Sequence, residues 1–414
     1  MSRDRLYKLA FSYRAAKLWN RLYDQELFAV TLSTGRIGYC CVMGKEGPHQ
    51  ALALYPGREE LESYFKLFTC SMDEVDTFRA QEIMHGQDCL QCAFECKARL
   101  TQEELDEAHL YGKAQGITFR GKNAFPQFVR YRPMRLPISM ISAEDTELMS
   151  DALDAALELA HRLDSEGKEA CGFSEDPAQI PLLTRDPEGG YLWSIHEIPM
   201  LPLPTYPSPE LEDELMLARV KRQKRTGATW HCELIAHPEP VPLPESGPSL
   251  EMVFPYTLFV ADLEAEMVYC THGVQDCEED AGTLVWEFAS LMMEAGKPIQ
   301  VFVRDNRTEA LLKRFMETVS IPLIRQEQDD ILEEVQQQWR EDLNETEMSV
   351  KDSLDFLCQV ILSLNDDELG DMPESLWQKI WSFASQGLLP KDLRKRILSI
   401  ERKPKDPDDP EEDE

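Results

Sequence analysis

Apolar residues recur along the first part of the chain with the spacings of helices and short strands. Residues 3–22 place Tyr7, Phe11, Leu18 and Leu22 close to one stripe, which predicts an amphipathic helix. Three apolar runs separated by turn residues then predict an antiparallel meander, at Leu27–Leu32, Ile37–Val42 and Ala51–Tyr55. A helix is expected next, at about 58–68, and a helix of this kind would cover one face of the sheet.

Strands and helices continue to alternate up to about residue 240. Residues 89–96 alternate as a strand does, and Thr101 followed by Glu104 has the spacing of a capping box at the start of a helix. Residues 116–137 read as a loop. Further elements are predicted as helices at 142–163 and 210–225 and strands at 191–197 and 229–236. We therefore predict an N-terminal domain over 1–240, with an antiparallel sheet covered by helices.

The second half of the chain predicts a different sheet. The proline-rich segment 241–253 is typical of a linker. Residues 254–345 follow the order β-β-α-β-α-β and end on a further helix, which requires a mixed sheet in an α/β arrangement. Residues 349–402 predict a small helical bundle, and the acidic, proline-containing tail 403–414 predicts disorder. The fold class expected for the whole chain is α+β.

Charge and cysteine content narrow the class of protein. The 414 residues carry a formal net charge of −33, which disfavours nucleic-acid binding by the whole chain. The N-terminus does not read as a signal peptide, and no apolar run is long enough to cross a membrane. Eleven scattered cysteines suit reduced thiols. The composition therefore predicts a cytoplasmic protein that does not bind membranes.

Several stretches resemble an uncharacterised bacterial protein family. They are FAVTLSTGRIGYCCVMGKEG, ALALYPGREEL, the 116–137 segment and SDALDAALELAHRL, followed by PYTLFVADLEAEMVYC, GKPIQVFVRDN and SIPLIRQ. They resemble multi-domain proteins of Firmicutes made of two adjacent domains of unknown function. The resemblance implies a bacterial cytosolic protein and carries no known activity. The family reads Arg-Pro-Gly where this chain has Arg132-Pro133-Met134, so we expect the backbone to differ there, because methionine disfavours positive φ.

Three acids of the second domain suggest metal chemistry. Asp262 and Asp305 end predicted strands, and Glu287 lies on the helix between them. Ribonuclease-H-like folds use such carboxylates to hold two Mg²⁺ ions for phosphodiester hydrolysis. Those folds usually have three strands before the first helix, whereas two are predicted here. The alternative is that Asp262 begins a turn and Asp305 caps a helix.

The 116–137 segment concentrates positive charge among aromatic residues. Such a combination can stack bases or bind phosphates, and here it marks a candidate binding site. The alternative is that its aromatic residues fix the loop to the core and its arginines pair with acids. The candidate binding residues are Arg120, Lys122, Arg130, Arg132 and Arg135.

The spacing of Cys89, Cys92 and Cys96 invites comparison with metal sites. On a strand, however, Cys89 and Cys92 point to opposite faces, and no second ligand pair follows. We therefore expect small apolar side chains rather than a metal site.

No nucleophile elbow, phosphate-binding loop or dinucleotide motif is found, which favours a non-catalytic protein without a cofactor. The leading hypothesis is a protein-interaction or scaffold protein with a protein partner. Its candidate surfaces are the 119–135 loop, the proline-rich segment 198–209 and the 350–400 helices. The alternative is a Mg²⁺-dependent phosphodiesterase using Asp262, Glu287 and Asp305.

Overall fold

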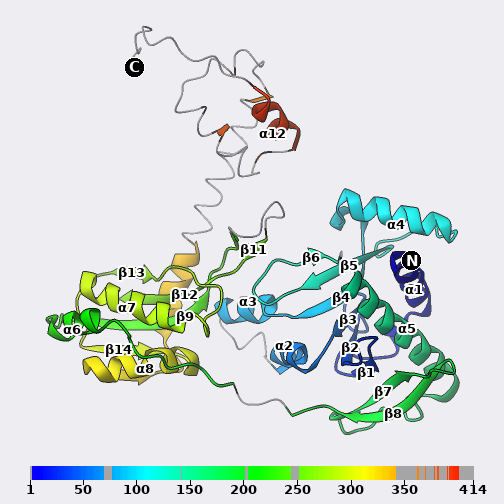
Figure 1. The fold of residues 1–414 in the computed structure, drawn as a ribbon, viewed down its shortest axis with the longest axis horizontal. Coiled ribbons are helices and arrows are strands. Elements are labelled where there is room, and N and C mark those ends of the chain that lie inside the picture. Colours follow the sequence, from blue (N-terminus) through cyan, green and yellow to red (C-terminus); the bar gives the residue numbers. More distant parts are fainter. Residues whose placement is uncertain are drawn as a thin grey trace. The chain divides into compact units, whose positions relative to one another are not determined.

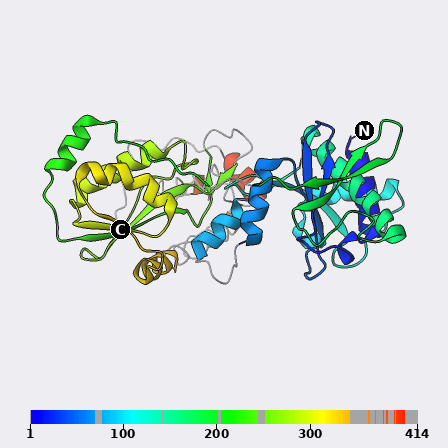
Figure 2. The same cartoon turned by 90° about the horizontal axis from the view of Figure 1, so that it is seen from below.

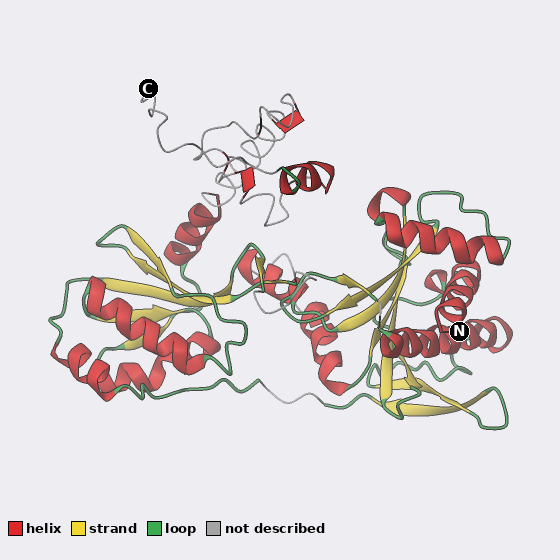
Figure 3. Ribbon diagram, turned by 45° about the horizontal axis from the view of Figure 1, so that its top comes forward, coloured by secondary structure: helices red, strands yellow, loops and turns green. Residues whose placement is uncertain are grey.

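The computed structural model describes residues 2–69, 77–140, 142–200, 204–243, 251–341 and 391–400, with single positions between 361 and 389. The chain divides into two units, 1–329 and 330–414. Within the described residues, the first unit contains two large sheets (Figures 1 and 3) and one small two-stranded sheet.

The N-terminal sheet has eight strands in the order β6-β5-β4-β3-β2-β1-β7-β8. Neighbours from β1 to β6 pair antiparallel, β7 lies parallel to β1, and β8 is antiparallel to β7. The predicted meander is therefore confirmed and forms the centre of a wider sheet. The strands are β1 Phe28–Thr31, β2 Ile37–Met43, β3 Ala51–Tyr55, β4 Cys89–Glu95, β5 Phe125–Tyr131, β6 Ile138–Ser139, β7 Gln179–Arg185 and β8 Tyr191–Glu197.

Alternating side chains give this sheet two buried faces. On one face, residues of α1 (Ser2–Ala16) and α5 (Ala143–Glu166) join a large apolar core, and α4 (Gln102–Ala114) contributes to it. On the other face, α2 (Arg58–Thr69) contributes Leu61 and Tyr64 to a smaller core. Two short 3₁₀ turns, η1 (Leu18–Asn20) and η2 (Lys97–Arg99), complete this part.

The predicted stripe on the first helix is confirmed, because Tyr7, Phe11, Leu18 and Leu22 are all buried. The helix itself ends at Ala16, since Lys17 takes a left-handed conformation and the 3₁₀ turn follows. The capping box is also confirmed: the Glu104 backbone N–H donates to Thr101 Oγ1, and the Thr101 N–H donates to the Glu104 carboxylate.

Part of the predicted 116–137 loop is a strand. In β5 four of the seven positions are fully buried, and the strand pairs with β4 along its whole length. The loop prediction was wrong there because the strand contains Pro126 and two charged or polar outward positions, which weaken the alternation that marks a strand. Pro126 lies opposite Phe94.

The second sheet has five strands in the order β13-β12-β9-β14-β15. The strands β9, β12 and β13 are antiparallel neighbours, while β14 is parallel to β9 and β15 is parallel to β14. The strand β9, which comes first in the sequence, is therefore the central strand of this sheet. The strands are β9 Thr229–Ala236, β12 Tyr256–Asp262, β13 Met267–Cys270, β14 Gln300–Val303 and β15 Leu323–Arg325.

The position of β9 corrects the predicted domain boundary. We expected residues 229–236 to close the N-terminal domain at 240, yet they pair with β12 and β14 of the second sheet. Trp230, Cys232 and Leu234 belong to the core of that sheet. A strand pattern does not say which sheet the strand joins, and so the boundary was placed too late in the chain.

The predicted linker 241–253 is corrected for the same reason. Its described residues contain β10 (Val241–Pro242) and β11 (Met252–Val253), which pair with each other. They come between β9 and β12, two neighbouring strands of one sheet. The segment is therefore an excursion within the second domain. The chain passes from the first sheet to the second between residues 198 and 213.

When β9 is counted with the second sheet, three antiparallel strands of that sheet, β9, β12 and β13, come before the helix at 281–295. The ribonuclease-H-like hypothesis requires three such strands, whereas the sequence pattern showed only two. The order is α6 (Glu214–Arg222), β9, β12, β13, α7 (Ala281–Ala295), β14, α8 (Asn306–Val319) and β15, with β10 and β11 inserted after β9.

One face of the second sheet is covered by α6, α7 and α8, which share a core with the strands. The helix α3 (Thr77–His85) of the N-terminal domain also contacts β9. Figures 1 and 2 both draw α3 between the two sheets.

The second unit contains a helix over 330–341 and α12 (Lys391–Leu398), with Leu393 and Ile397 buried. The helix α12 lies within the predicted bundle 349–402. Most of the predicted bundle 349–402 and the tail 403–414 lie outside the described residues.

Trp230 offers a direct test of the second core, because it is fully buried and contacts the ring of Phe288 edge-on. Replacing Trp230 with alanine is expected to lower the free energy of unfolding by about 3–5 kcal/mol, since a large cavity forms. Urea denaturation followed by circular dichroism measures this change. Trp286→Ala is the matched control, because that side chain is 44% exposed and its loss should cost less than about 1 kcal/mol.

Candidate functional site

The three candidate catalytic acids each have a structural partner of their own. Asp262 accepts hydrogen bonds from Trp230 Nε1 at 2.8 Å and from the Ala265 N–H at 3.0 Å. Glu287 accepts from the His272 N–H at 2.6 Å. Asp305 caps α8, where it accepts from the Thr308 N–H at 2.6 Å.

The sheet topology also keeps these acids apart. Asp262 lies level with Trp230, near the start of β9. The parallel strand β14 has Val303 level with Cys232, so Asp305 lies further along, toward the other end of β9. The two acids belong to strands that β9 separates. The three acids therefore do not form the predicted metal-binding set. Asp262 stabilises a turn and Asp305 caps a helix, which are the alternative roles that the sequence suggested for these two residues.

The five candidate cations do not form one site either. Arg130 pairs with Asp88 at 2.7 Å, Arg132 pairs with Glu251 at 2.9 Å, and Arg135 also pairs with Glu251. The expectation that these five residues form one binding site is therefore corrected, and the ion-pair alternative holds for these three.

Arg120 and Lys122 differ from the other three cations. Both are exposed and precede β5, whereas Arg132 and Arg135 follow it. A seven-residue strand spans roughly 23 Å, so the two ends of β5 offer separate surfaces.

The cysteines behave as small apolar residues. Cys89 lies in the core on one face of the sheet and Cys92 in the core on the other, as expected from strand geometry. Cys96 follows the strand. Burial raises the pKa of the Cys89 thiol to about 12 and raises that of Cys92 as well, so both stay protonated at neutral pH. Among the described residues, no group of three or more His, Cys, Asp or Glu side chains is arranged to hold a metal ion.

An ion pair that is nearly shielded from solvent lies where α3 meets the second domain, with Arg307 10% and Glu82 13% exposed. Arg307, at the start of α8, donates from Nη1 to Glu82 Oε1 at 2.6 Å and from Nη2 to Glu82 Oε2 at 3.1 Å. The same Nη2 donates to the Leu234 carbonyl at 2.6 Å. One guanidinium therefore joins α3 of the N-terminal domain, the end of β9 and the start of α8. We call this set the junction.

Two further side chains complete the junction. Arg79 pairs with Glu82 at 3.0 Å from one helical turn away. The Tyr256 hydroxyl donates to Glu82 Oε1, and the Tyr256 ring lies under the Arg307 guanidinium, whose carbon is 5.2 Å from the ring centre. The carboxylate of Glu82 is thus held by two cations and a hydroxyl.

Electrostatics favour the charged forms at the junction. Burial alone would raise the pKa of Glu82, but Arg307 and Arg79 outweigh it, and the pKa lies below its usual range. Burial would lower the pKa of Arg307, yet Glu82 raises it overall. Burial raises the pKa of Tyr256, and Glu82 raises it further, so the hydroxyl remains a donor.

A second set of buried polar side chains lies along β9. His231 and Glu233 point away from the core that contains Trp230. His231 Nδ1 lies 2.5 Å from Asp329 Oδ2, and Arg304 lies 3.6 Å from Glu233. The sequence did not single out any of these pairs, because their members are 71 or more positions apart.

The carboxyl ends of parallel strands are the usual place for a ligand in sheets of this kind. Here β9 and β14 form such a pair, and their ends are occupied by Arg304 with Glu233 and by Arg307 with Glu82. Each carboxylate is already neutralised by a guanidinium. The carboxylates of Glu82 and Glu233 therefore belong to ion pairs in this region.

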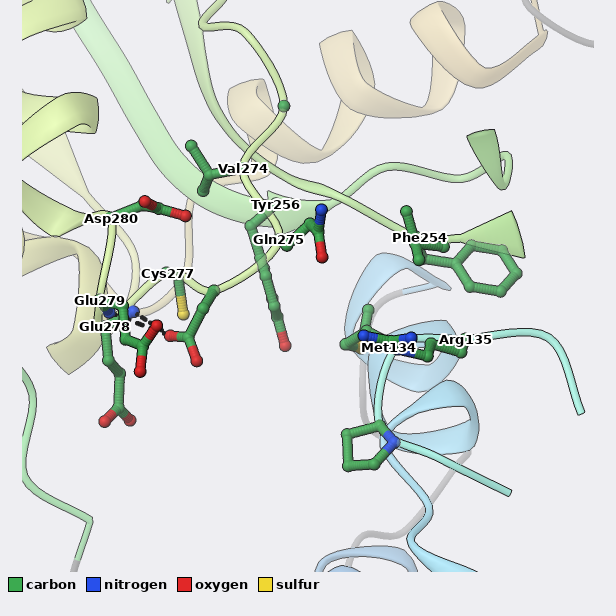
Figure 4. Close-up of a pocket in the computed structure, with 14 residues that line it drawn as sticks. Met134, Arg135, Phe254, Tyr256, Val274, Gln275, Cys277, Glu278, Glu279 and Asp280 are labelled. Carbon is green, nitrogen blue, oxygen red and sulfur yellow. Dashed lines mark hydrogen bonds between the residues drawn. The ribbon is translucent and has the colours of Figure 1, made fainter. Parts of the chain in front are cut away.

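A groove of about 900 Å³ opens beside the junction. Tyr256 lies at its floor, with Met134 and Arg135 on one wall (Figure 4). The opposite wall is the acidic loop before α7, where the Asp276 carboxylate accepts from the N–H groups of Glu278 and Glu279. Met134 on the first wall corrects an expectation, because it takes a positive φ of 55° although methionine disfavours that conformation. Two backbone hydrogen bonds hold it there: the Met134 N–H donates to the His85 carbonyl, and the Met134 carbonyl accepts from the Phe254 N–H.

Sequence reasoning missed Glu82 and Arg307 altogether. They are 225 positions apart, and each by itself reads as an ordinary exposed charge on a helix. The available signal was Arg307 directly after the strand end VFVRDN, where a helix N-terminus disfavours a cation. An arginine at that place indicates a buried acidic partner.

These observations define a two-domain α+β protein whose sheets meet at a buried ion-pair network. Comparison with known families agrees: residues 4–180 match a domain of unknown function (DUF7309), and residues 216–339 match another domain of unknown function (DUF6930). The protein thus carries these two domains one after the other, and the second match begins before β9, as the fold requires. Neither a curated protein nor a solved structure matches the chain. Within the described residues, no helix has both the length and the apolar character of a membrane span.

The junction gives a prediction for stability. Replacing Arg307 with methionine leaves the Glu82 carboxylate buried beside a single arginine, and should lower the free energy of unfolding by about 3–5 kcal/mol. Adding Glu82→Gln removes the stranded charge and should restore part of the loss. Arg314→Met is the control on the same helix, because its pair with Glu210 is exposed and is worth less than about 1 kcal/mol.

The pH dependence follows from the lowered pKa of Glu82. Its stabilisation is complete above the unfolded-state pKa of about 4.3 and is lost as the pH falls through the lower folded-state value. Denaturant titrations from pH 7 to pH 3 should therefore show a steeper acid loss of stability in the wild type than in Glu82→Gln. Equal slopes in the two proteins would contradict the assignment.

Proposed function

We propose that this protein is a non-catalytic protein-interaction or scaffold protein. The proposal rests on what lies at the ends of strands β9 and β14, where a sheet of this kind would hold a substrate. Two ion pairs fill that place, Arg307 with Glu82 and Arg304 with Glu233. Such a junction fixes two domains to each other and leaves their outer surfaces for partners. The proposed activity needs no metal ion or cofactor.

The surface best suited to a protein partner is the outer edge of β8. This strand is the last in its sheet, is seven residues long, and contains neither proline nor lysine. Natural sheets usually protect such an edge with those residues, because its unpaired N–H and C=O groups bind other strands. Leu192 is 55% exposed and Ile195 is 53% exposed.

An extended segment of a partner can bind such an edge as an added strand. Main-chain hydrogen bonds supply the affinity, while alternate side chains supply the specificity. In β8 the side chains of Leu192 and Ile195 point to opposite faces, so a bound segment would meet an apolar side chain on each face. The net charge of −33 further supports a protein partner over a nucleic acid.

The test places a charge on this edge. Ile195→Lys and Leu192→Lys should leave the thermal unfolding midpoint nearly unchanged, because both side chains are more than half exposed, and should abolish capture of the partner from a native lysate. Leu110→Lys is the matched control, since Leu110 is 64% exposed on α4 and lies away from the edge.

Two results would contradict this proposal. One is a wild-type protein that captures no reproducible partner and runs as a monomer on sizing. The other is a partner that both edge variants capture as strongly as the wild type does, because the partner would then bind elsewhere.

A further inference from the structure

A second cavity lies on the N-terminal domain, at the end of α1 and away from the junction. It has a volume of about 520 Å³, which falls in the range of small-molecule sites. We call it the cationic groove. Its lining combines two cations, Arg14 and Lys17, with neutral polar and apolar side chains, and it includes no carboxylate.

The charge of Arg14 is held in place without being neutralised. Its Nε donates to the Asn123 carbonyl at 2.9 Å and its Nη2 to the Arg120 carbonyl at 3.4 Å. Carbonyl groups orient a guanidinium and leave its full positive charge. Among the described residues, no carboxylate forms an ion pair with Arg14 or with Lys17. In a chain with 76 acidic residues, such a pocket of positive charge is exceptional.

Lys17 lies at a position where its backbone disfavours it. Its φ of 50° and ψ of 47° are left-handed, and it directly follows the last residue of α1. Glycine is the residue that ordinarily ends a helix in this conformation, because it lacks the Cβ that crowds the backbone. A lysine here therefore sacrifices some stability and supplies a cation to the groove.

The loop that borders the groove adds further positive charge. Residues 116–118 line the groove, and Arg14 fastens the next part of the loop through the Arg120 carbonyl. Arg120 and Lys122 are exposed in that part. Within the part of the chain that the structure describes, these are the two predicted binding residues without an acidic partner.

We propose that the cationic groove binds a small organic anion that bears a phosphate or carboxylate group. Arg14 and Lys17 bind the anionic group, since a charge-assisted hydrogen bond to either oxyanion is stronger than a neutral one. Asn20, Gln50 and Thr118 provide neutral polar contacts, and Ile117 with Ala15 provides an apolar surface for the rest of the ligand. This site is independent of the β8 edge.

Isothermal titration of the full-length protein tests the proposal with three probes: phenyl phosphate, phenylacetate and inorganic phosphate. Phenyl phosphate or phenylacetate should bind the wild type more tightly than inorganic phosphate, and the stronger of the two identifies the anionic group. Lys17→Gly should weaken that binding about tenfold, the loss expected for one charged hydrogen bond.

The same variant separates binding from folding. Because glycine suits the left-handed position, Lys17→Gly should unfold at the same temperature as the wild type or at a higher one. Lys313→Ala is the control: it removes one exposed cation from α8 and should bind like the wild type.

Three outcomes would overturn the proposal. They are no binding of either organic probe to the wild type, equal weakening in Lys17→Gly and Lys313→Ala, or binding only of a hexaglutamate peptide tested in parallel. The last result would assign the groove to an acidic protein segment instead of a small ligand. None of these outcomes bears on the β8 edge, because the edge variants leave the groove intact.

Discussion

The ion pair between Glu82 and Arg307 is the interaction on which the arrangement of the first unit depends. It joins α3, which follows the N-terminal meander, to the first turn of α8 and to the Leu234 carbonyl in β9. A buried pair of this kind adds little net stability against an apolar replacement, but it is expensive to break from one side only. We therefore expect its main effect to be specificity for one relative position of the two domains, because a misplaced contact would leave one charge buried without its partner.

This constraint also determines where the protein can act. The second sheet has the strand order of a fold that can carry catalytic carboxylates, yet its parallel strand ends serve the junction. Asp262 is engaged in a turn, Asp305 caps α8, and Glu287 accepts a hydrogen bond from the His272 N–H. The two binding surfaces that we propose lie on the N-terminal domain: the edge of β8 and the cationic groove at the end of α1. We propose an extended protein segment for the first and a small anion for the second, so the two proposals concern different partners.

Local patterns predicted much of this fold from the sequence. The stripe of Tyr7 and Phe11, the capping box at Thr101 and the central strands depend on near neighbours in the chain, and they were identified correctly. Features that depend on residues far away in the sequence were not identified correctly. The strand 229–236 was recognised but assigned to the wrong sheet, and Glu82 gave no sign of Arg307. Of the five predicted binding cations, three have acidic partners as much as 119 positions away, a pairing that spacing cannot reveal.

The central claim is that the junction makes the two domains unfold as one. Differential scanning calorimetry of the wild type and of the Glu82→Gln/Arg307→Met double variant tests it most directly. We expect a single transition that includes both domains in the wild type, and two separate transitions in the double variant, because each core stays intact while the charges that join them are gone. A double variant that still unfolds in one transition at the wild-type temperature would contradict the account.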